Sequence, residues 1–329
     1  MTCSHIIKHC IIVRCFFNYR VIMKRLLPIT MMVCSLLPLL NGCEVVQWKT
    51  DHDKTVLHDD GFTKHSLALN EGGTLTYWEG GQGEPLLLLH GFGGTAAATW
   101  KAEMLELSKH YRVIAPDLLW FGESQSKAEA RLATQTQAIW QLVDHLKLQK
   151  INVAGISYGG FVTYDMMTTP ERINKAIIIA SPGPLFSDND LADLVKRANV
   201  NTPEALFVPS GADGIRRLYD NVFVKKKPMP DFVAEQIYQG YFSQWKPERT
   251  SLIQTLPLDR DRIQQFDPSH LPKLMLIWGE KDKIFPLSNG IKLSKYTQAP
   301  IVVIPNTAHG VTNEQPELTS ELINNFLQQ

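Results

Sequence analysis

Gly155-Ile156-Ser157-Tyr158-Gly159 says more about how this chain folds than any other segment, because it sets a serine between two glycines in the pattern G-x-S-x-G. The apolar run 151–154 precedes it, and residues 160–167 after it are predicted to be helical. A serine on a tight turn from strand to helix has its hydroxyl held above the edge of the sheet, and such a turn needs small residues two positions to either side. The segment therefore predicts a nucleophile elbow that carries Ser157.

Three apolar runs elsewhere lead into loops with polar residues. Residues 84–89 are predicted to form a buried strand that ends in His90-Gly91-Phe92-Gly93-Gly94. The run 273–278 leads into Gly279-Glu280-Lys281-Asp282, and the run 301–304 leads into a loop that contains His309. Ser157, Asp282 and His309 thus follow one another along the chain, each just after a predicted strand. That order is typical of one serine hydrolase fold and differs from the orders in others.

These features together resemble the α/β-hydrolase family, over roughly residues 62–326. Short apolar runs also alternate here with amphipathic segments of helix length, which is typical of a mostly parallel sheet with helices on both faces. We expect an α/β-hydrolase fold whose core comprises residues 62–183 and 268–329. The predicted strands are 75–78, 86–89, 113–115, 151–154, 176–179, 274–278 and 301–304, and the clearest helices are 132–146 and 318–327.

Within residues 184–267 the strand pattern stops and helical character takes over. The resemblance implies that this segment is a helical cap over the serine, as in the cap-bearing serine esterases and lipases. Its apolar side chains are candidate contacts for an acyl chain, and the alternative is that most of them pack the helices of the cap itself. They include Leu191, Leu194, Leu206, Phe207, Ile215, Leu218, Tyr219, Phe232, Ile237, Tyr238 and Trp245.

The resemblance also implies a role for each residue of the site. Ser157 would attack the substrate, His309 would take the proton of the serine hydroxyl as general base, and Asp282 would fix the tautomer of His309. The backbone N–H groups of Phe92 and Tyr158 would form the oxyanion hole, which stabilises the negative oxygen that develops on the substrate.

Two other carboxylates, Glu280 and Asp117, also lie just after predicted strands and are weighed against Asp282 for the role of the catalytic acid. Glu280 lies two residues earlier and is the rival for the catalytic acid, but the family's pattern of a strand followed by G-x-x-D favours Asp282. Asp117 begins the loop 117–124, which resembles the family's D-x-x-G-x-G-x-S with Trp120 in place of the first glycine. Asp117 is expected to be structural, and Trp120 to reshape the wall of the pocket.

The N-terminal segment resembles an export signal. Met23-Lys24-Arg25 precedes the uncharged apolar residues 26–40, which are fewer than the about 20 that a membrane-spanning helix needs. The segment ends in Leu40-Asn41-Gly42-Cys43, which is similar to a bacterial lipobox, although Asn41 departs from the usual Ala, Ser or Thr. We expect residues 1–42 to be a leader, with Met23 as the true start of translation. Cys43 is expected to be lipidated.

These features predict an exported protein that a lipid anchor on Cys43 holds at a bacterial membrane. Glu44 is not the aspartate that typically retains such lipoproteins at the inner membrane, so the outer membrane is favoured. Residues 43–61 are rich in polar side chains and are expected to form a short tether. The alternative is an ordinary secretory signal, which would give a secreted or periplasmic protein.

The composition excludes several classes of function. The whole chain has 33 basic and 33 acidic residues, but residues 1–42 hold five basic and no acidic ones, so the remainder carries five net negative charges. A nucleic-acid partner is not expected, because no basic stripe or binding motif occurs. His90 is expected to support the oxyanion loop, and the histidines show no metal-ligand spacing, so neither metal nor cofactor is predicted. All five cysteines fall within the first 43 residues.

A serine at the nucleophile position excludes the family's dehalogenases and epoxide hydrolases, which attack with aspartate. We expect a carboxylesterase or lipase that acts on a small-molecule acyl ester or a lipid through an acyl-enzyme intermediate. The alternatives are a carbon-carbon bond hydrolase of the same fold and a noncatalytic binding protein. Export favours ester or lipid breakdown, since the substrates of the carbon-carbon hydrolases arise inside the cell.

Overall fold

The computed structural model describes residues 44–226 and 228–329, which belong to one compact unit from Glu44 to Gln329. The predicted leader, residues 1–42, and the predicted lipidation site, Cys43, lie outside the described residues. Within the described part, none of the helices has the length and apolar character needed to cross a membrane.

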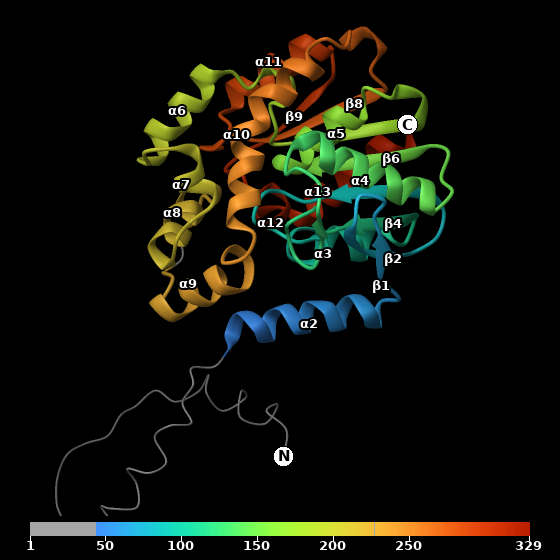
Figure 1. Ribbon diagram of the computed structural model, residues 1–329. Coiled ribbons are helices and arrows are strands. Elements are labelled where there is room, and N and C mark those ends of the chain that lie inside the picture. The colour runs from blue at the N-terminus through green and yellow to red at the C-terminus, as the bar shows by residue number, and fades with distance from the viewer. Residues whose placement is uncertain (1–43, 227) are drawn as a thin grey trace, which may run out of the picture. The chain divides into compact units, whose positions relative to one another are not determined.

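A nine-stranded sheet forms the centre of this unit (Figure 1). Its strands lie in the order β1-β2-β4-β3-β6-β7-β8-β9, with β5 paired to β2. The strands from β4 to β9 along this path pair in parallel, whereas β2 pairs antiparallel with β1, β4 and β5. They are β1 (Thr63–Ala68), β2 (Gly73–Gly80), β3 (Glu84–Leu89), β4 (Tyr111–Pro116), β5 (Gln125–Ser126), β6 (Ile151–Ile156), β7 (Ile173–Ile179), β8 (Lys273–Gly279) and β9 (Ile301–Ile304).

This sheet confirms the predicted fold class, and each of the seven predicted strands lies inside an observed one. Two observed strands, β1 and β5, were not predicted from the sequence. β1 has the sequence T-K-H-S-L-A and lies at the edge of the sheet, with no residue fully buried, so its sequence carries no apolar pattern. Its place depends on backbone pairing to β2, which hydropathy does not report.

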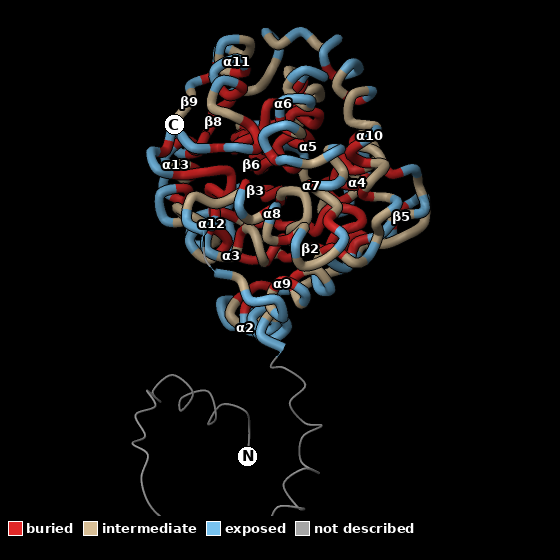
Figure 2. Tube along the Cα trace, turned by 90° about the vertical axis from the view of Figure 1, so that its left-hand side faces the viewer, coloured by how far each residue is buried: buried red, intermediate tan, exposed pale blue. Residues whose placement is uncertain are grey.

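Helices cover both faces of the sheet, and two apolar layers result. Leu86 and Leu88 of β3 pack with side chains of α3 and α13, whereas Leu87 and Leu89 belong to the layer of α4, α5 and α11. Figure 2 shows buried residues concentrated along the central strands and exposed residues on the outer sides of the helices. The flanking helices are α3 (Ala96–Leu107), α4 (Leu132–His145), α5 (Tyr158–Met166), α11 (Leu287–Thr297), α12 (Val311–Glu314) and α13 (Pro316–Gln328), and short turns η2 (Pro170–Arg172) and η5 (Pro268–His270) precede β7 and β8.

Between β7 and β8 the chain is helical, and these helices stand along one side of the core (Figure 1). This is the segment predicted to be a cap, and its division from the core at residues 184 and 267 stays a prediction. The helices are η3 (Gly183–Leu185), α6 (Asp188–Ala198), α7 (Pro203–Phe207), α8 (Ala212–Val222), α9 (Asp231–Ile237), η4 (Tyr238–Phe242) and α10 (Lys246–Ile263).

The segment predicted to be a tether is instead a helix, α2 (Val45–Asp59), so an irregular tether is wrong over this range. Leu57 is fully buried, and the buried carboxylate of Asp53 accepts a hydrogen bond of 2.6 Å from Lys101 of α3. The hydroxyls of Thr50 and Tyr241 lie 2.9 Å apart and join α2 to η4. The prediction failed because the segment is polar in overall composition, although one face of the helix, with Asp53 and Leu57, is buried.

Candidate active site

Ser157 stands on a strained turn between β6 and α5, as the G-x-S-x-G pattern predicts. Its backbone has φ 54° and ψ −117°, a conformation that non-glycine residues rarely adopt. A Cβ added to Gly155 would lie 2.2 Å from the carbonyl oxygen of Gly159, and one added to Gly159 would lie 2.2 Å from that of Leu89. Only glycine fits at either position, because strand, turn and helix approach so closely.

The structure brings Ser157, Asp282 and His309 together from three loops at the carboxyl ends of β6, β8 and β9. Nδ1 of His309 lies 2.9 Å from Oδ2 of Asp282, and Nε2 lies 2.8 Å from Oγ of Ser157. All three side chains are buried. A carboxylate can only accept here, so Nδ1 carries the proton and Nε2 is free to accept from the serine hydroxyl.

Asp282 is held in place by its own loop. Its Oδ1 accepts hydrogen bonds from the backbone N–H groups of Ile284 at 2.8 Å and Phe285 at 2.9 Å, which leaves Oδ2 directed at His309. Glu280, the rival acid, is exposed and accepts instead from the N–H of Asn306 at 3.0 Å. The geometry therefore favours Asp282 as the partner of His309.

The loop predicted to hold half of the oxyanion hole lies directly against the serine. A Cβ added to Gly91 would be 3.2 Å from Cβ of Ser157. The rings of Phe92 and Tyr158 meet edge to face with their centroids 5.6 Å apart. Tyr158 is the first residue of α5, so its N–H has no acceptor within the helix. Both predicted donor residues thus border Ser157.

His90 supports this loop through two hydrogen bonds that need the neutral imidazole. Nδ1–H donates to the carbonyl of Gly91 at 2.7 Å, and Nε2 accepts from the N–H of Leu118 at 2.8 Å. Burial lowers the pKa of His90 to about 4. The expected supporting role of His90 therefore agrees with its contacts.

Asp117 and Trp120 shape the neighbouring loop. Asp117 is buried, accepts a hydrogen bond of 2.8 Å from the N–H of Ala96, and has its pKa raised to about 6 by burial. It contacts neither Ser157 nor His309 through a hydrogen bond, which fits the structural role expected for it. Trp120, where the family has glycine, adopts φ 65°. An L-residue thus occupies a backbone conformation that favours glycine.

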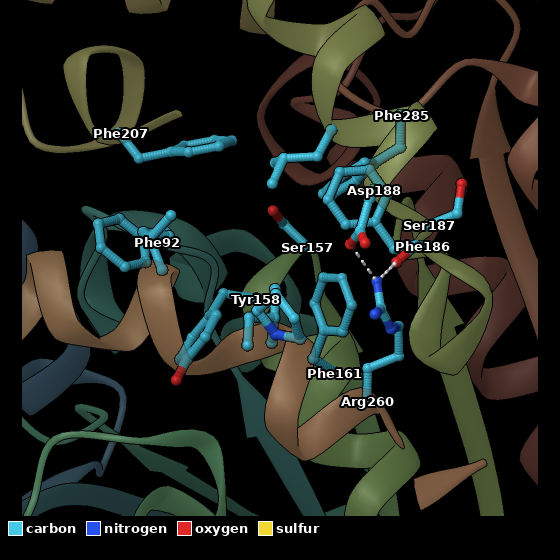
Figure 3. Close-up of a pocket in the computed structure, with 14 residues that line it drawn as sticks. Phe92, Ser157, Tyr158, Phe161, Phe186, Ser187, Asp188, Phe207, Arg260 and Phe285 are labelled. Carbon is cyan, nitrogen blue, oxygen red and sulfur yellow. Dashed lines mark hydrogen bonds and ion pairs between the residues drawn. The ribbon is translucent and has the colours of Figure 1, made fainter. Parts of the chain in front are cut away.

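An apolar pocket opens above Ser157 (Figure 3). Phe92, Tyr158, Phe161 and Phe285 of the core form one part of the wall beside Ser157, and the other lining residues belong to the segment 184–267 that is predicted to be a cap. Of the apolar cap residues named from the sequence, Leu191 and Phe207 line this pocket. Several other lining residues were not predicted from the sequence: Phe161, Phe186, Ile253, Leu256, Pro257 and Phe285. Phe285 could have been predicted from the sequence, because it lies only three residues after Asp282 in the loop that carries the catalytic acid.

The one cationic side chain in the pocket wall is Arg260, and carboxylates already neutralise it. Its guanidinium forms an ion pair with Asp188 at 2.8 Å and donates to the carbonyl of Phe186 at 3.1 Å (Figure 3). It also forms an ion pair with Asp261 at 3.0 Å. Across residues 44–226 and 228–329, no cluster of three or more His, Cys, Asp or Glu side chains could hold a metal ion.

Comparisons with known proteins agree with this architecture. The family model described as "alpha/beta hydrolase fold" matches residues 84–312. A 2-hydroxymuconate semialdehyde hydrolase from Pseudomonas sp. (strain CF600) is 28% identical over 263 residues, which cover 76% of this chain and 88% of that protein. Lipase 1 from Psychrobacter immobilis is 28% identical over 251 residues, covering 74% and 77%. The crystal structure of a bacterial membrane phospholipase A is similar in fold, with a TM-score of 0.69, 22% identity, and coverage of 91% of this chain and 96% of that chain.

Proposed function

Because the chain belongs to the alpha/beta hydrolase family, we propose that it hydrolyses carboxylic esters with uncharged, apolar acyl groups, as a carboxylesterase or lipase. The observation that carries this proposal is a Ser-His-Asp arrangement that opens into an apolar pocket whose one cation is already paired. The reaction is acyl transfer to water through a covalent intermediate on Ser157.

In the first half of the reaction, Oγ of Ser157 bonds to the carbonyl carbon of the ester while Nε2 of His309 takes the hydroxyl proton. Asp282 stabilises the imidazolium that forms. When the tetrahedral intermediate collapses, the bond to the leaving alcohol breaks and His309 returns the proton to that alcohol. Water then attacks the acyl-enzyme in the same manner, and the carboxylic acid leaves.

The negative oxygen of each tetrahedral intermediate needs donors that are already in place. We assign these donors to the backbone N–H groups of Phe92 and Tyr158, which border Ser157 on two sides. Loss of one such donor typically costs about 3 kcal/mol of transition-state stabilisation. His90 contributes indirectly, because its hydrogen bonds hold the loop that carries Phe92.

Carbon-carbon bond hydrolysis is the second candidate, and the similarity to a 2-hydroxymuconate semialdehyde hydrolase favours it. Such a substrate carries a carboxylate, which a pocket must neutralise. Here Arg260 is occupied by Asp188 and Asp261, and the remaining lining is mostly apolar. An uncharged acyl chain suits this pocket better. A noncatalytic role is disfavoured, because the site keeps every hydrogen bond of the triad.

We further propose that the enzyme is exported and held at a membrane by a lipid on Cys43. Support comes from the order of basic start, apolar stretch and Leu40-Asn41-Gly42-Cys43. An enzyme anchored in this way would meet lipid or other apolar esters at the cell envelope. Its partner would then be the membrane itself, through the N-terminal anchor.

The proposal is tested by hydrolysis of p-nitrophenyl esters from acetyl to palmitoyl, with a chain that begins at Glu44 and with its Ser157→Ala variant. We expect turnover that disappears in Ser157→Ala while the melting temperature stays close to wild type. A maximum at short chains would identify a carboxylesterase, and one at long chains a lipase. Turnover that survives in Ser157→Ala would mean that another residue is the nucleophile.

A further inference from the structure

Arg249, in the first turn of α10, is a buried cation between cap and core. Only 3% of its surface is exposed. Nε donates to the carbonyl of Trp120 at 2.7 Å, and Nη1 donates to the carbonyl of Tyr241 at 2.5 Å. Glu248 attracts it electrostatically, but among the described residues no carboxylate forms an ion pair with it. Burial lowers the pKa of Arg249 to about 10, so the guanidinium is still charged at neutral pH.

One aromatic ring separates this charge from the oxyanion loop. The guanidinium carbon of Arg249 lies 4.6 Å from the centroid of the Phe121 ring, in a cation-π contact. The same ring meets Phe92 edge to face at 4.9 Å and His90 at 5.5 Å. Phe121 therefore contacts both the cation and the loop that carries the proposed oxyanion donor.

The two carbonyls that Arg249 binds belong to segments that flank the oxyanion loop. Trp120 has φ 65°, and the hydrogen bond from Arg249 holds its carbonyl in this conformation. Tyr241 precedes Phe242, whose ring would be 2.4 Å from a Cβ added to Gly93 of the oxyanion loop. Arg249 thus joins a core loop and a cap segment that both press on the oxyanion loop.

We propose that Arg249 is a positioning residue for the oxyanion hole and that its unpaired charge favours the negative tetrahedral intermediate over the neutral ester. This inference rests on the proposed chemistry of Ser157. It explains why a buried arginine lacks a carboxylate partner, since a partner would cancel the field at the site. A unit charge about 10 Å from the negative oxygen, in a medium of effective dielectric constant about 20, changes the rate by on the order of tenfold.

The test compares kcat and KM of wild type with Arg249→Met and Arg249→Lys, on the ester that wild type turns over best. We expect Arg249→Met to lower kcat by about tenfold or more, with KM within about twofold, because the loss falls on the transition state. Arg249→Lys keeps the charge and should recover part of kcat. If Arg249→Met does not fold, Arg249→Gln serves in its place, since it is also neutral and keeps a donor.

Arg172→Met is the matched control. Arg172 also makes a cation-π contact, with its guanidinium carbon 4.5 Å from the ring centroid of Trp140. Unlike Arg249 it has an ion-pair partner, Asp144, and neither Arg172 nor Trp140 lines the pocket. Its loss should lower the melting temperature without changing kcat. If Arg249→Met behaves as Arg172→Met does, with stability lower and kcat unchanged, the proposal is overturned.

A second readout separates charge from general loosening of the pocket. A trifluoromethyl ketone forms a hemiketal with Ser157: Oγ bonds to the carbonyl carbon, His309 takes the hydroxyl proton, and the ketone oxygen becomes negative. The corresponding trifluoromethyl carbinol cannot form this adduct and binds as a neutral molecule. Arg249→Met should weaken the ketone by the same factor as kcat/KM and leave the carbinol unchanged; equal weakening of both would contradict the proposal. This adduct needs no ester turnover, so failure of the proposed ester activity is distinguished from failure of the Arg249 proposal.

Discussion

At the scale of the residue, the backbone rather than side-chain packing fixes the direction of the Ser157 hydroxyl. Its N–H donates to the carbonyl of Ile179 at 2.9 Å while its own φ is 54°. Strain of this kind costs on the order of 1–3 kcal/mol and persists only where the surroundings demand it. Here the surroundings are the parallel pairing of β6 with β7 and the close packing at Gly155 and Gly159, which together hold the turn in this conformation.

Asp282→Asn is predicted to lower kcat by about 10⁴, because an amide would direct its NH₂ at His309 and favour the wrong tautomer. Glu280→Gln is the control, since Glu280 contacts Asn306 and not the imidazole. Steady-state hydrolysis of one ester by both variants checks the prediction. A larger loss in Glu280→Gln would make Glu280 the catalytic acid.

His90 should make the stability of the protein depend on pH. Its pKa in the folded state, about 4, lies below the ordinary value of 6.5, so the neutral form stabilises the fold. This contribution is complete above pH 6.5 and is lost as the pH falls through 4; in total it is at most about 3 kcal/mol. Asp117 acts in the opposite direction. Its pKa in the folded state, about 6, lies above the ordinary value of 3.8, so the protonated form stabilises the fold, and this contribution is lost as the pH rises through 6.

The difference between wild type and His90→Asn isolates the histidine from Asp117. Urea unfolding at pH 7.5 and pH 5 should show that the stability advantage of wild type shrinks on acidification. A difference that is the same at both pH values would show that His90 does not titrate in this way.

The residues of the triad could be predicted from sequence because each is marked by a local pattern after a strand. Phe186, Phe161 and Arg249 could not, because their roles depend on packing between segments far apart in the chain. Their own neighbours in sequence carry no sign of it.

At the scale of the element, α2 shows how one buried face decides between helix and tether. Asp53 is 5% exposed and is bound by Lys101, while Asp51 two residues earlier is exposed and is bound by Gln47 of the same helix. The charged composition predicted a solvated segment, but alternating buried and exposed sides make a helix that packs on α3 and α9.

Asp53→Asn is predicted to destabilise the protein by about 1–3 kcal/mol, because it leaves the ammonium group of Lys101 without its carboxylate. Asp51→Asn, on the same helix, should change the free energy of unfolding by less than about 0.5 kcal/mol. Thermal or urea unfolding of the two variants checks the contrast. Equal effects would mean that α2 does not depend on its contact with α3.

At the scale of the whole molecule, the α/β-hydrolase core was predictable, whereas the lining of the pocket was predictable only in part, at residues such as Leu191 and Phe207. Central strands such as β3 and β6 consist mostly of buried apolar residues, so hydropathy alone locates them. The pocket lies where cap helices α6, α7 and α10 meet α5 and loops of the core, and its shape follows from contacts that no local pattern reports.

The proposed lipid anchor makes a prediction for the full-length chain in a bacterial host. Cys43→Ser should move the enzyme from the membrane fraction to the soluble fraction, because acylation needs the cysteine thiol. Ester hydrolysis in the two fractions measures the distribution, and Ser157→Ala gives the background. An unchanged distribution would remove the lipoprotein proposal and leave the ester hydrolase proposal intact.

The most direct measurement compares kcat/KM for p-nitrophenyl hexanoate and for 2-hydroxymuconate semialdehyde, with the chain from Glu44 and its Ser157→Ala variant. We predict that the ester is preferred by about a hundredfold or more, since an unpaired carboxylate in an apolar pocket costs several kcal/mol. Both activities should vanish in Ser157→Ala. A preference for the semialdehyde would contradict the account and identify a carbon-carbon bond hydrolase built on the same triad.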